Sequence, residues 1–190
     1  MSPLPAISFD RFDTLAKLMP HEQVTSVSRS FEEAEGLTAP ILVLTLRNDS
    51  GGRRPNILGP NTLIRIGQAF EEVRQELAAQ PDRYSAVVVA SDGPAFVAGA
   101  DLTMAKLVNG QQPAEEMAEL GNVVFNILDE LPVPTIAFVH GAAIGGGLEL
   151  ALAADHRAVS AGARNLSLPE AFLGLLPGWG GVYRLPHLIG

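Results

Sequence analysis

Glu149 is the residue with the clearest chemical potential, because it is the one charged side chain in the apolar and glycine-rich stretch 142–154. A carboxylate buried in such surroundings must find hydrogen-bond partners or stay neutral. Glycines fill positions 145–147, and the residues that follow are good helix formers. We therefore expect a glycine turn that opens a buried helix, with Glu149 on its first turn. Free N–H groups and the positive dipole end at a helix start suit a reaction that builds negative charge on an oxygen.

Glu170 is a second isolated carboxylate, in the apolar stretch 168–176. Pro169, Pro177 and several glycines predict a rigid and irregular backbone around it. Two carboxyl groups can act as acid and base when their environments differ. In the alternative interpretation, the glycines only allow close helix packing and the glutamates form ion pairs.

Three further features lie in loops beside predicted strands. The loop 91–102 is rich in small residues and directly follows an apolar strand, which is a usual place for a binding site. Asp101 in that loop is interpreted first as the cap of a short helix at 102–108. Arg53 and Arg54 are the one adjacent basic pair in the chain, and they could meet phosphates or simply be solvated. His140 at a strand end is expected to be structural.

These candidates must be positioned by an alternation of strands and helices that indicates one α/β domain at 39–190. Residues 1–38 are interpreted as an irregular leader with a short strand near 23–28. Apolar runs of strand length and apolar faces with a period of three to four residues define the main elements. Strands are predicted at 41–46, 85–90, 135–139, 157–160 and 165–168, and helices at 61–79, 113–131 and 181–188.

Composition excludes several classes of function. The chain has 190 residues and a net charge of -8, which argues against a nucleic-acid partner. Zero cysteines rule out disulfides and cysteine–metal sites, and we expect no metal. No signal peptide or membrane span is predicted, so the expected location is the cytoplasm. Nucleotide binding is unsupported, because Gly147 stands where a P-loop needs lysine, and no G-x-S-x-G serine-hydrolase elbow occurs.

Three stretches together resemble the crotonase, or enoyl-CoA hydratase/isomerase, family: 98–102, 140–149 and 168–181. The segment 54–58 also resembles the loop after that family's first strand. The resemblance covers 39–190 and implies a crotonase-like stacked β-β-α superhelix. It also implies that the family's C-terminal helices, which complete the acyl pocket and the trimer contacts, are missing from this chain.

The resemblance assigns roles to particular residues. It places an oxyanion hole at the backbone N–H groups of Ala100 and Gly146. It makes Glu149 and Glu170 the catalytic residues: Glu149 orients and activates water, and Glu170 delivers a proton. No metal or redox cofactor is implied, and coenzyme A enters only as part of the substrate. Substrate contacts are implied for Ala98, Gly99, Asp101, Leu102, Gly145, Arg54, Asn56, Pro177 and Gly178.

The implied reaction is addition of water to a trans-2-enoyl-CoA, giving a 3-hydroxyacyl-CoA in fatty-acid β-oxidation. An enoyl-CoA isomerase on the same fold is an alternative, as is a non-catalytic acyl-CoA-binding module. The wording of residues 177–181 resembles the hydratase modules of multifunctional fatty-acid oxidation proteins. That likeness implies a 3-hydroxyacyl-CoA dehydrogenase region further along a longer natural chain, and the family implies a homotrimer or hexamer.

Overall fold

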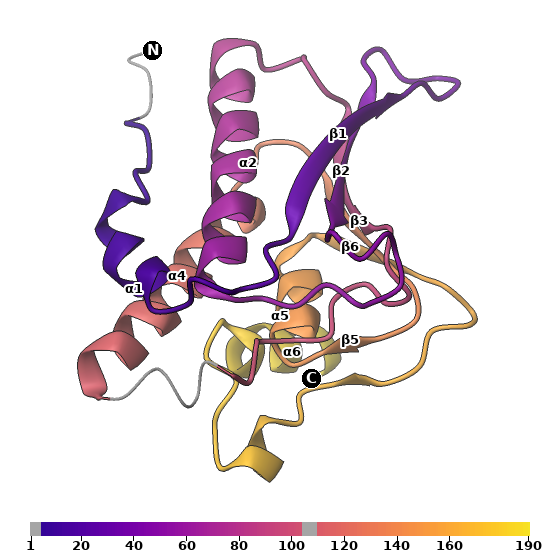
Figure 1. The fold of residues 1–190 in the computed structure, drawn as a ribbon. Helices are drawn as coiled ribbons and strands as arrows, with labels where there is room; N and C mark the ends of the chain where they lie inside the picture. The colour runs from indigo at the N-terminus through magenta and orange to yellow at the C-terminus, as the bar shows by residue number, and fades with distance from the viewer. Residues whose placement is uncertain (1–4, 104–109) are drawn as a thin grey trace.

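The structure, a computed structural model, describes residues 5–103 and 110–190 and contains a five-stranded sheet with helices packed beside it (Figure 1). The strand order is β1-β2-β3-β4-β6. The β1 strand is antiparallel to β2, and the other neighbours are parallel. The bounds are β1 Ser26–Glu32, β2 Ile41–Arg47, β3 Ala86–Ser91, β4 Thr135–Val139 and β6 His156–Val159. A separate pair, β5 Ala143–Ile144 and β7 Leu166–Ser167, forms a two-stranded parallel sheet.

The sheet owes its orientation to the alternation of side chains along each strand. Leu42, Leu44 and Leu46 of β2 are fully buried in the core, whereas the residues between them are only partly covered. Because β2, β3 and β4 run parallel, their carboxyl ends meet at one edge of the sheet. The loops that leave this edge are consequently neighbours, and they contain the segments singled out in the sequence.

Two long helices cover the buried face of the sheet. They are α2 at Pro60–Ala79 and α4 at Gln111–Asp129, and they pack against each other. Both were predicted within two residues at each end. The α4 helix ends before Leu131 because a residue that precedes proline is disfavoured in helical conformation. The smaller elements are α5 at Gly146–Ala153, the 3-10 turn η2 at Glu170–Leu173 and α6 at Gly181–Ile189.

The leader is more ordered than the sequence predicts. It forms the 3-10 turn η1 at Asp10–Phe12, the helix α1 at Asp13–Lys17 and the strand β1, which pairs with β2 over its whole length. Phe9, Phe12, Leu15 and Met19 of the leader are buried in the same core as α2 and α4. The strand predicted near 23–28 corresponds to β1, a few residues further along. The α1 helix was not predicted, because a helix of this length is stabilised by tertiary packing rather than by its own propensity.

No helix within the described ranges, 5–103 and 110–190, combines the length and the apolar character that crossing a membrane requires.

Burial of the leader predicts its contribution to stability. Leu15→Ala removes a side chain that is 1% exposed and should lower the free energy of unfolding by about 2–5 kcal/mol. Leu18→Ala, three residues away and 37% exposed, is the matched control and should cost less than about 1 kcal/mol. Urea unfolding of both variants measures the difference, and equal losses would contradict a leader packed into the core.

Candidate active site

The α5 helix begins at a glycine turn and carries Glu149 on its first turn, as the sequence predicts. Glu149 is only 2% exposed. Its Oε1 atom accepts hydrogen bonds from the backbone N–H groups of Trp179 and Gly181, each at 2.8 Å. Within the described ranges Glu149 forms no salt bridge, so this carboxylate is held by backbone donors and not by an arginine in direct contact.

Burial sets the protonation behaviour of Glu149. Loss of solvent raises the pKa of its carboxyl group above the ordinary value. The two backbone hydrogen bonds oppose this shift, as does the positive charge of Arg184, while the negative charge of Glu170 adds to it. The result is a carboxyl group that takes up a proton more readily than one in water.

Glu170 opens η2 and is half-buried. Its Oε2 atom is buried and has no hydrogen-bond partner in the described part of the chain. Its Oε1 atom lies so close to Gly145 that a Cβ at that position would sit 2.6 Å away. Gly145 also has a φ of 52°, which side chains other than glycine rarely adopt. Glycine at this turn therefore lets the Glu170 carboxylate approach the start of α5.

Two backbone N–H groups on adjacent segments complete the arrangement. Ala100 forms a parallel bridge with Leu58. The two hydrogen bonds of this bridge run from the Leu58 N–H to the Gly99 carbonyl and from the Asp101 N–H to the Leu58 carbonyl. The N–H of Ala100 itself is therefore left out of the bridge. Gly146 is the first residue of α5, where helix N–H groups lack helical partners. Among residues 5–103 and 110–190, neither N–H has a hydrogen-bond partner.

The segments that carry these two donors lie side by side. Val97 and Ala143 form a parallel bridge, and Ile144 donates its N–H to the Val97 carbonyl at 3.2 Å. Gly99 approaches the carbonyl of Ile144 so closely that a Cβ there would lie 2.8 Å from it. The structure thus brings together the stretches around 100, 146, 149 and 170, which are far apart in sequence.

Asn56 is fully buried, and its side chain joins the ends of β2 and β3. The amide nitrogen donates to the Leu46 carbonyl at 3.0 Å and the Ser91 hydroxyl at 2.9 Å, and the amide oxygen accepts from Asn48 at 2.9 Å and Thr25 at 3.3 Å. Its backbone carbonyl accepts from the N–H of Ala98 at 2.9 Å. Asn56 therefore supports the segment 98–101 from behind.

Asp101 makes a contact of the capping type. Its Oδ1 accepts from the N–H of Thr103 at 2.9 Å and from the Thr103 hydroxyl at 2.7 Å. The predicted helix at 102–108 lies mostly outside the described residues, while Leu102 is 60% exposed. His140 has a structural contact, because its Nε2 lies 2.8 Å from the Gly93 carbonyl in the neighbouring loop.

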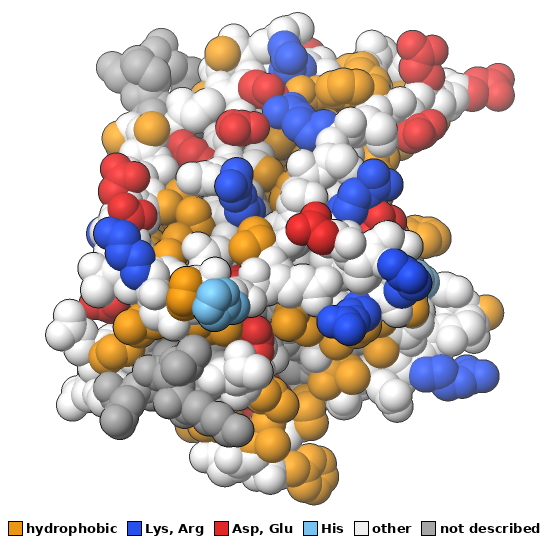
Figure 2. Space-filling model, viewed as in Figure 1, with side chains coloured by type: hydrophobic (Ala, Val, Ile, Leu, Met, Phe, Trp, Pro, Cys, Tyr) orange, Lys and Arg blue, Asp and Glu red, His pale blue; other side chains and the backbone are white. Residues whose placement is uncertain are grey.

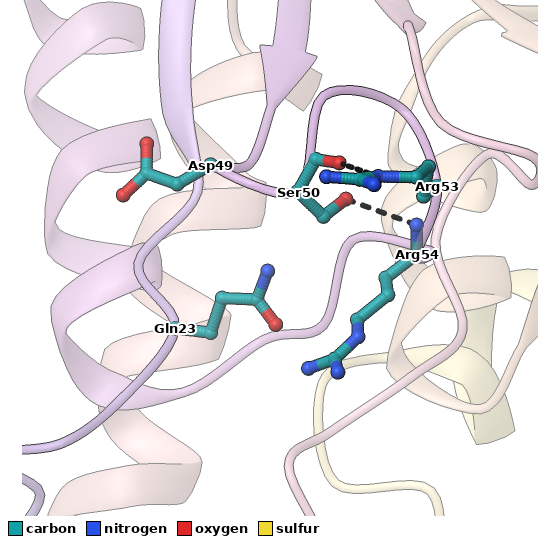
Figure 3. A pocket seen from close by; sticks show the side chains of 5 residues that line it. All are labelled: Gln23, Asp49, Ser50, Arg53 and Arg54. Carbon is teal, nitrogen blue, oxygen red and sulfur yellow. Dashed lines mark hydrogen bonds between the residues drawn. The ribbon is translucent and has the colours of Figure 1, made fainter.

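Arg53 and Arg54 line an open pocket of about 540 Å³ together with Gln23, Asp49 and Ser50 (Figure 3). The side chain of Arg53 turns back on its own loop and donates to the Ser50 carbonyl at 3.0 Å. Arg54 is fastened through its backbone N–H to the Ser50 hydroxyl, and its side chain extends away from the loop (Figure 3). Its guanidinium has no partner among the described residues, so it is free to meet an anion.

Sequence analysis did not identify the loop 178–181 as the support of Glu149. The Trp179 side chain is 7% exposed, donates its Nε1–H to the Met117 carbonyl at 3.2 Å and meets Phe125 edge to face. Pro177 is half-buried, and the Gly178 carbonyl accepts from Asn122 of α4 at 2.7 Å. The Pro-Gly-Trp-Gly-Gly sequence was a signal for this loop, but it did not say which backbone groups face the carboxylate.

An exposed apolar surface borders Glu170. Figure 2 shows hydrophobic side chains gathering on the lower part of this face, where Figure 1 places η2 and α6. Among the most exposed are Phe172 at 93% and Leu176 at 82%.

Comparison with known proteins identifies a family and relatives of this chain. A family model described as enoyl-CoA hydratase/isomerase matches residues 38–190. The chain is 42% identical over 132 residues to the fatty acid oxidation complex subunit alpha of Shewanella sp. (strain W3-18-1) and to that of Shewanella halifaxensis. The match covers 68% of this chain but 19% of each relative, so the chain spans about a fifth of their length.

Solved structures share the fold. The structure of Pseudomonas aeruginosa DspI has a TM-score of 0.70 and 33% identity, covering 89% of this chain and 58% of that one. An enoyl-CoA hydratase from Bacillus anthracis has a TM-score of 0.71 and 26% identity, covering 87% of this chain and 58% of that one.

The raised pKa of Glu149 predicts how stability depends on pH. A carboxyl group with a raised folded-state pKa contributes stability that is present below its ordinary value, about 4.5, and is lost as pH rises through the folded pKa. Glu149→Gln cannot ionise and keeps an acceptor oxygen for both N–H groups. The variant should therefore gain stability relative to the parent as pH rises above about 4.5, the ordinary value. Urea unfolding over a series of rising pH values measures the gain.

The control is Glu115→Gln on the exposed surface of α4, which makes the same substitution away from Glu149 and should change the free energy of unfolding by less than about 0.5 kcal/mol. Parallel stability curves for the parent and Glu149→Gln would contradict the raised pKa.

Proposed function

The chain belongs to the enoyl-CoA hydratase/isomerase family, and from this premise we propose that it is an enoyl-CoA hydratase. The observation that carries the proposal is the meeting of two carboxylates, Glu149 and Glu170, with the unpaired N–H groups of Ala100 and Gly146. The substrate would be a trans-2-enoyl thioester of coenzyme A and the product a 3-hydroxyacyl-CoA. The names of the Shewanella relatives support a role in fatty-acid oxidation.

The two N–H groups would act on the thioester carbonyl. As the oxygen of water bonds to the β-carbon, the π electrons of the double bond move toward the thioester oxygen and form an enolate. Donors fixed in advance stabilise such an oxyanion, and removal of one typically costs about 100- to 1,000-fold in rate. Ala100 is fixed by the bridge to Leu58, and Gly146 by the turn at Gly145. Both donors are main-chain groups, so the chemistry needs no metal or redox cofactor.

We assign water activation to Glu149. Its Oε1 is occupied by two backbone donors, while the described chain supplies no donor to Oε2, which we assign to the water. Glu149 takes a proton from the water as the bond to the β-carbon forms. Glu170, whose Oε2 is buried without a partner, delivers a proton to the α-carbon as the enolate collapses. Return of a proton from Glu149 to Glu170 through solvent restores the starting state.

Binding of the substrate would use two surfaces. The acyl chain would lie against the exposed apolar side chains beside Glu170. The guanidinium of Arg54 would attract the phosphates of coenzyme A, since it is exposed and unpaired among the described residues. Asp101 and Leu102 would contact the substrate between its acyl chain and its coenzyme A part.

The first expected outcome concerns the carboxylates. Glu149→Gln and Glu170→Gln should each lower kcat for hydration of crotonyl-CoA by about 100-fold or more, because each removes one proton-transfer group. The measurement is the loss of the conjugated enoyl-thioester absorbance. Glu115→Gln serves as the control and should keep the parent rate. Turnover of a 3-enoyl-CoA that depends on Glu170 alone would favour an isomerase, and binding of acyl-CoA without turnover would favour a binding module.

The second expected outcome concerns coenzyme A. Arg54→Gln should raise KM for crotonyl-CoA about 2- to 5-fold at low salt, the size typical of an exposed charge pair, and added salt should reduce the effect. The matched control substrate is crotonyl-pantetheine, which lacks the phosphates of coenzyme A. Arg54→Gln should leave the KM for this thioester unchanged. An equal rise in KM for both thioesters would contradict a contact with phosphate.

A further inference from the structure

The loop 178–181, which holds Glu149, is itself fastened to α4. Beyond the two contacts already described, from Asn122 to the Gly178 carbonyl and from the Trp179 indole to the Met117 carbonyl, a third contact comes from Arg184 on α6. All three join the loop to residues of the helices α4 and α6. The position of the Trp179 and Gly181 N–H groups is therefore set by α4 and α6.

Arg184 makes the most extensive of these contacts. Its side chain is 10% exposed. One nitrogen of its guanidinium, Nη1, donates to the Trp179 carbonyl at 3.2 Å. The other, Nη2, donates to the Asn126 Oδ1 at 2.8 Å and the Asp129 Oδ2 at 3.0 Å near the end of α4. The planar fork of an arginine can hold several acceptors at fixed directions, which a lysine cannot do.

Trp179 is consequently held on both of its backbone groups. Its N–H donates to Glu149, and its carbonyl accepts from Arg184. Gly180 leaves room for this contact, because a Cβ there would collide with Nη1. We propose that Arg184 is a positioning residue for Glu149: it fixes the loop whose N–H groups orient the carboxylate and places a positive charge behind them. This inference rests on the proposed function only where it predicts kcat; the structural role of Arg184 does not depend on it.

The charges around Glu149 make the inference testable by pH. Glu170 on η2 and Arg184 on α6 act on the carboxylate in opposite directions. On α4, Asp129 is paired with Arg184 at 3.0 Å. At the far end of α5, Arg157 on β6 donates to the Ala151 and Ala154 carbonyls. The strands β4 and β5 carry no charged residue. Loss of the Arg184 charge should therefore leave the carboxylate easier to protonate.

Trp179 offers a readout that does not depend on catalysis, since it is the sole tryptophan of the chain. Its fluorescence should change when Glu149 is protonated, and the change should be absent in Glu149→Gln. In Arg184→Gln the midpoint of this transition should move to higher pH, because the cation that favours the charged form is gone. The acid limb of kcat for crotonyl-CoA should move the same way, and kcat at its plateau should fall about 10- to 100-fold with little change in KM.

Arg184→Lys keeps the charge but loses the fork, so its midpoint should stay near that of the parent while kcat falls. Arg65 is an exposed arginine on α2, and Arg65→Gln is the control for loss of one positive charge. This variant should change neither the fluorescence midpoint nor kcat. An unmoved midpoint in Arg184→Gln, or full kcat in Arg184→Lys, would overturn the inference; if Arg184→Gln does not fold, the Lys variant decides. A moved midpoint in a chain without hydratase activity would support the positioning role and refute the proposed function instead.

Discussion

The structure depends on burying one carboxylate together with its hydrogen-bond donors. Glu149 lies on an apolar helix, and an unpaired charge there would cost several kcal/mol. Hydrogen bonds from two backbone N–H groups offset this cost, and they come from a loop that begins about 30 residues further along the chain. The loop must therefore be rigid, which explains its attachment to α4 and α6. A surface glutamate would need none of this support.

The parallel sheet brings together segments that are distant in the sequence. Strands β2, β3 and β4 end at one edge, and the loops that follow them carry Asn56, Ala100 and Gly146. The buried Asn56 amide joins two of these strand ends, so the backbone of the donor segment is supported by side-chain hydrogen bonds as well as by the sheet. Main-chain donors held in this way are fixed before a ligand arrives, which is the condition for oxyanion stabilisation.

Much of this arrangement could be predicted from the sequence. Apolar runs and periodic faces located β4, α2 and α4 within two residues, and the glycine turn placed Glu149 on the first turn of α5. What the sequence could not give depends on tertiary contacts. The α1 helix has too few residues for a periodic pattern, and Asn56 in a polar loop does not look like a buried residue. The partners of Glu149 are backbone groups, which any residue type would offer, so only the fold identifies them.

The separation between Glu149 and its loop has a consequence for synthesis on the ribosome. Chains grow from the N-terminus at about 5–20 residues per second, so α5 is synthesised before Trp179 and Gly181. During that interval the nascent α5 has a carboxylate without its donors. Full burial of the Glu149 carboxylate with both of its donors requires the later segment that begins α6, so docking of α5 and docking of α6 are expected to be coupled.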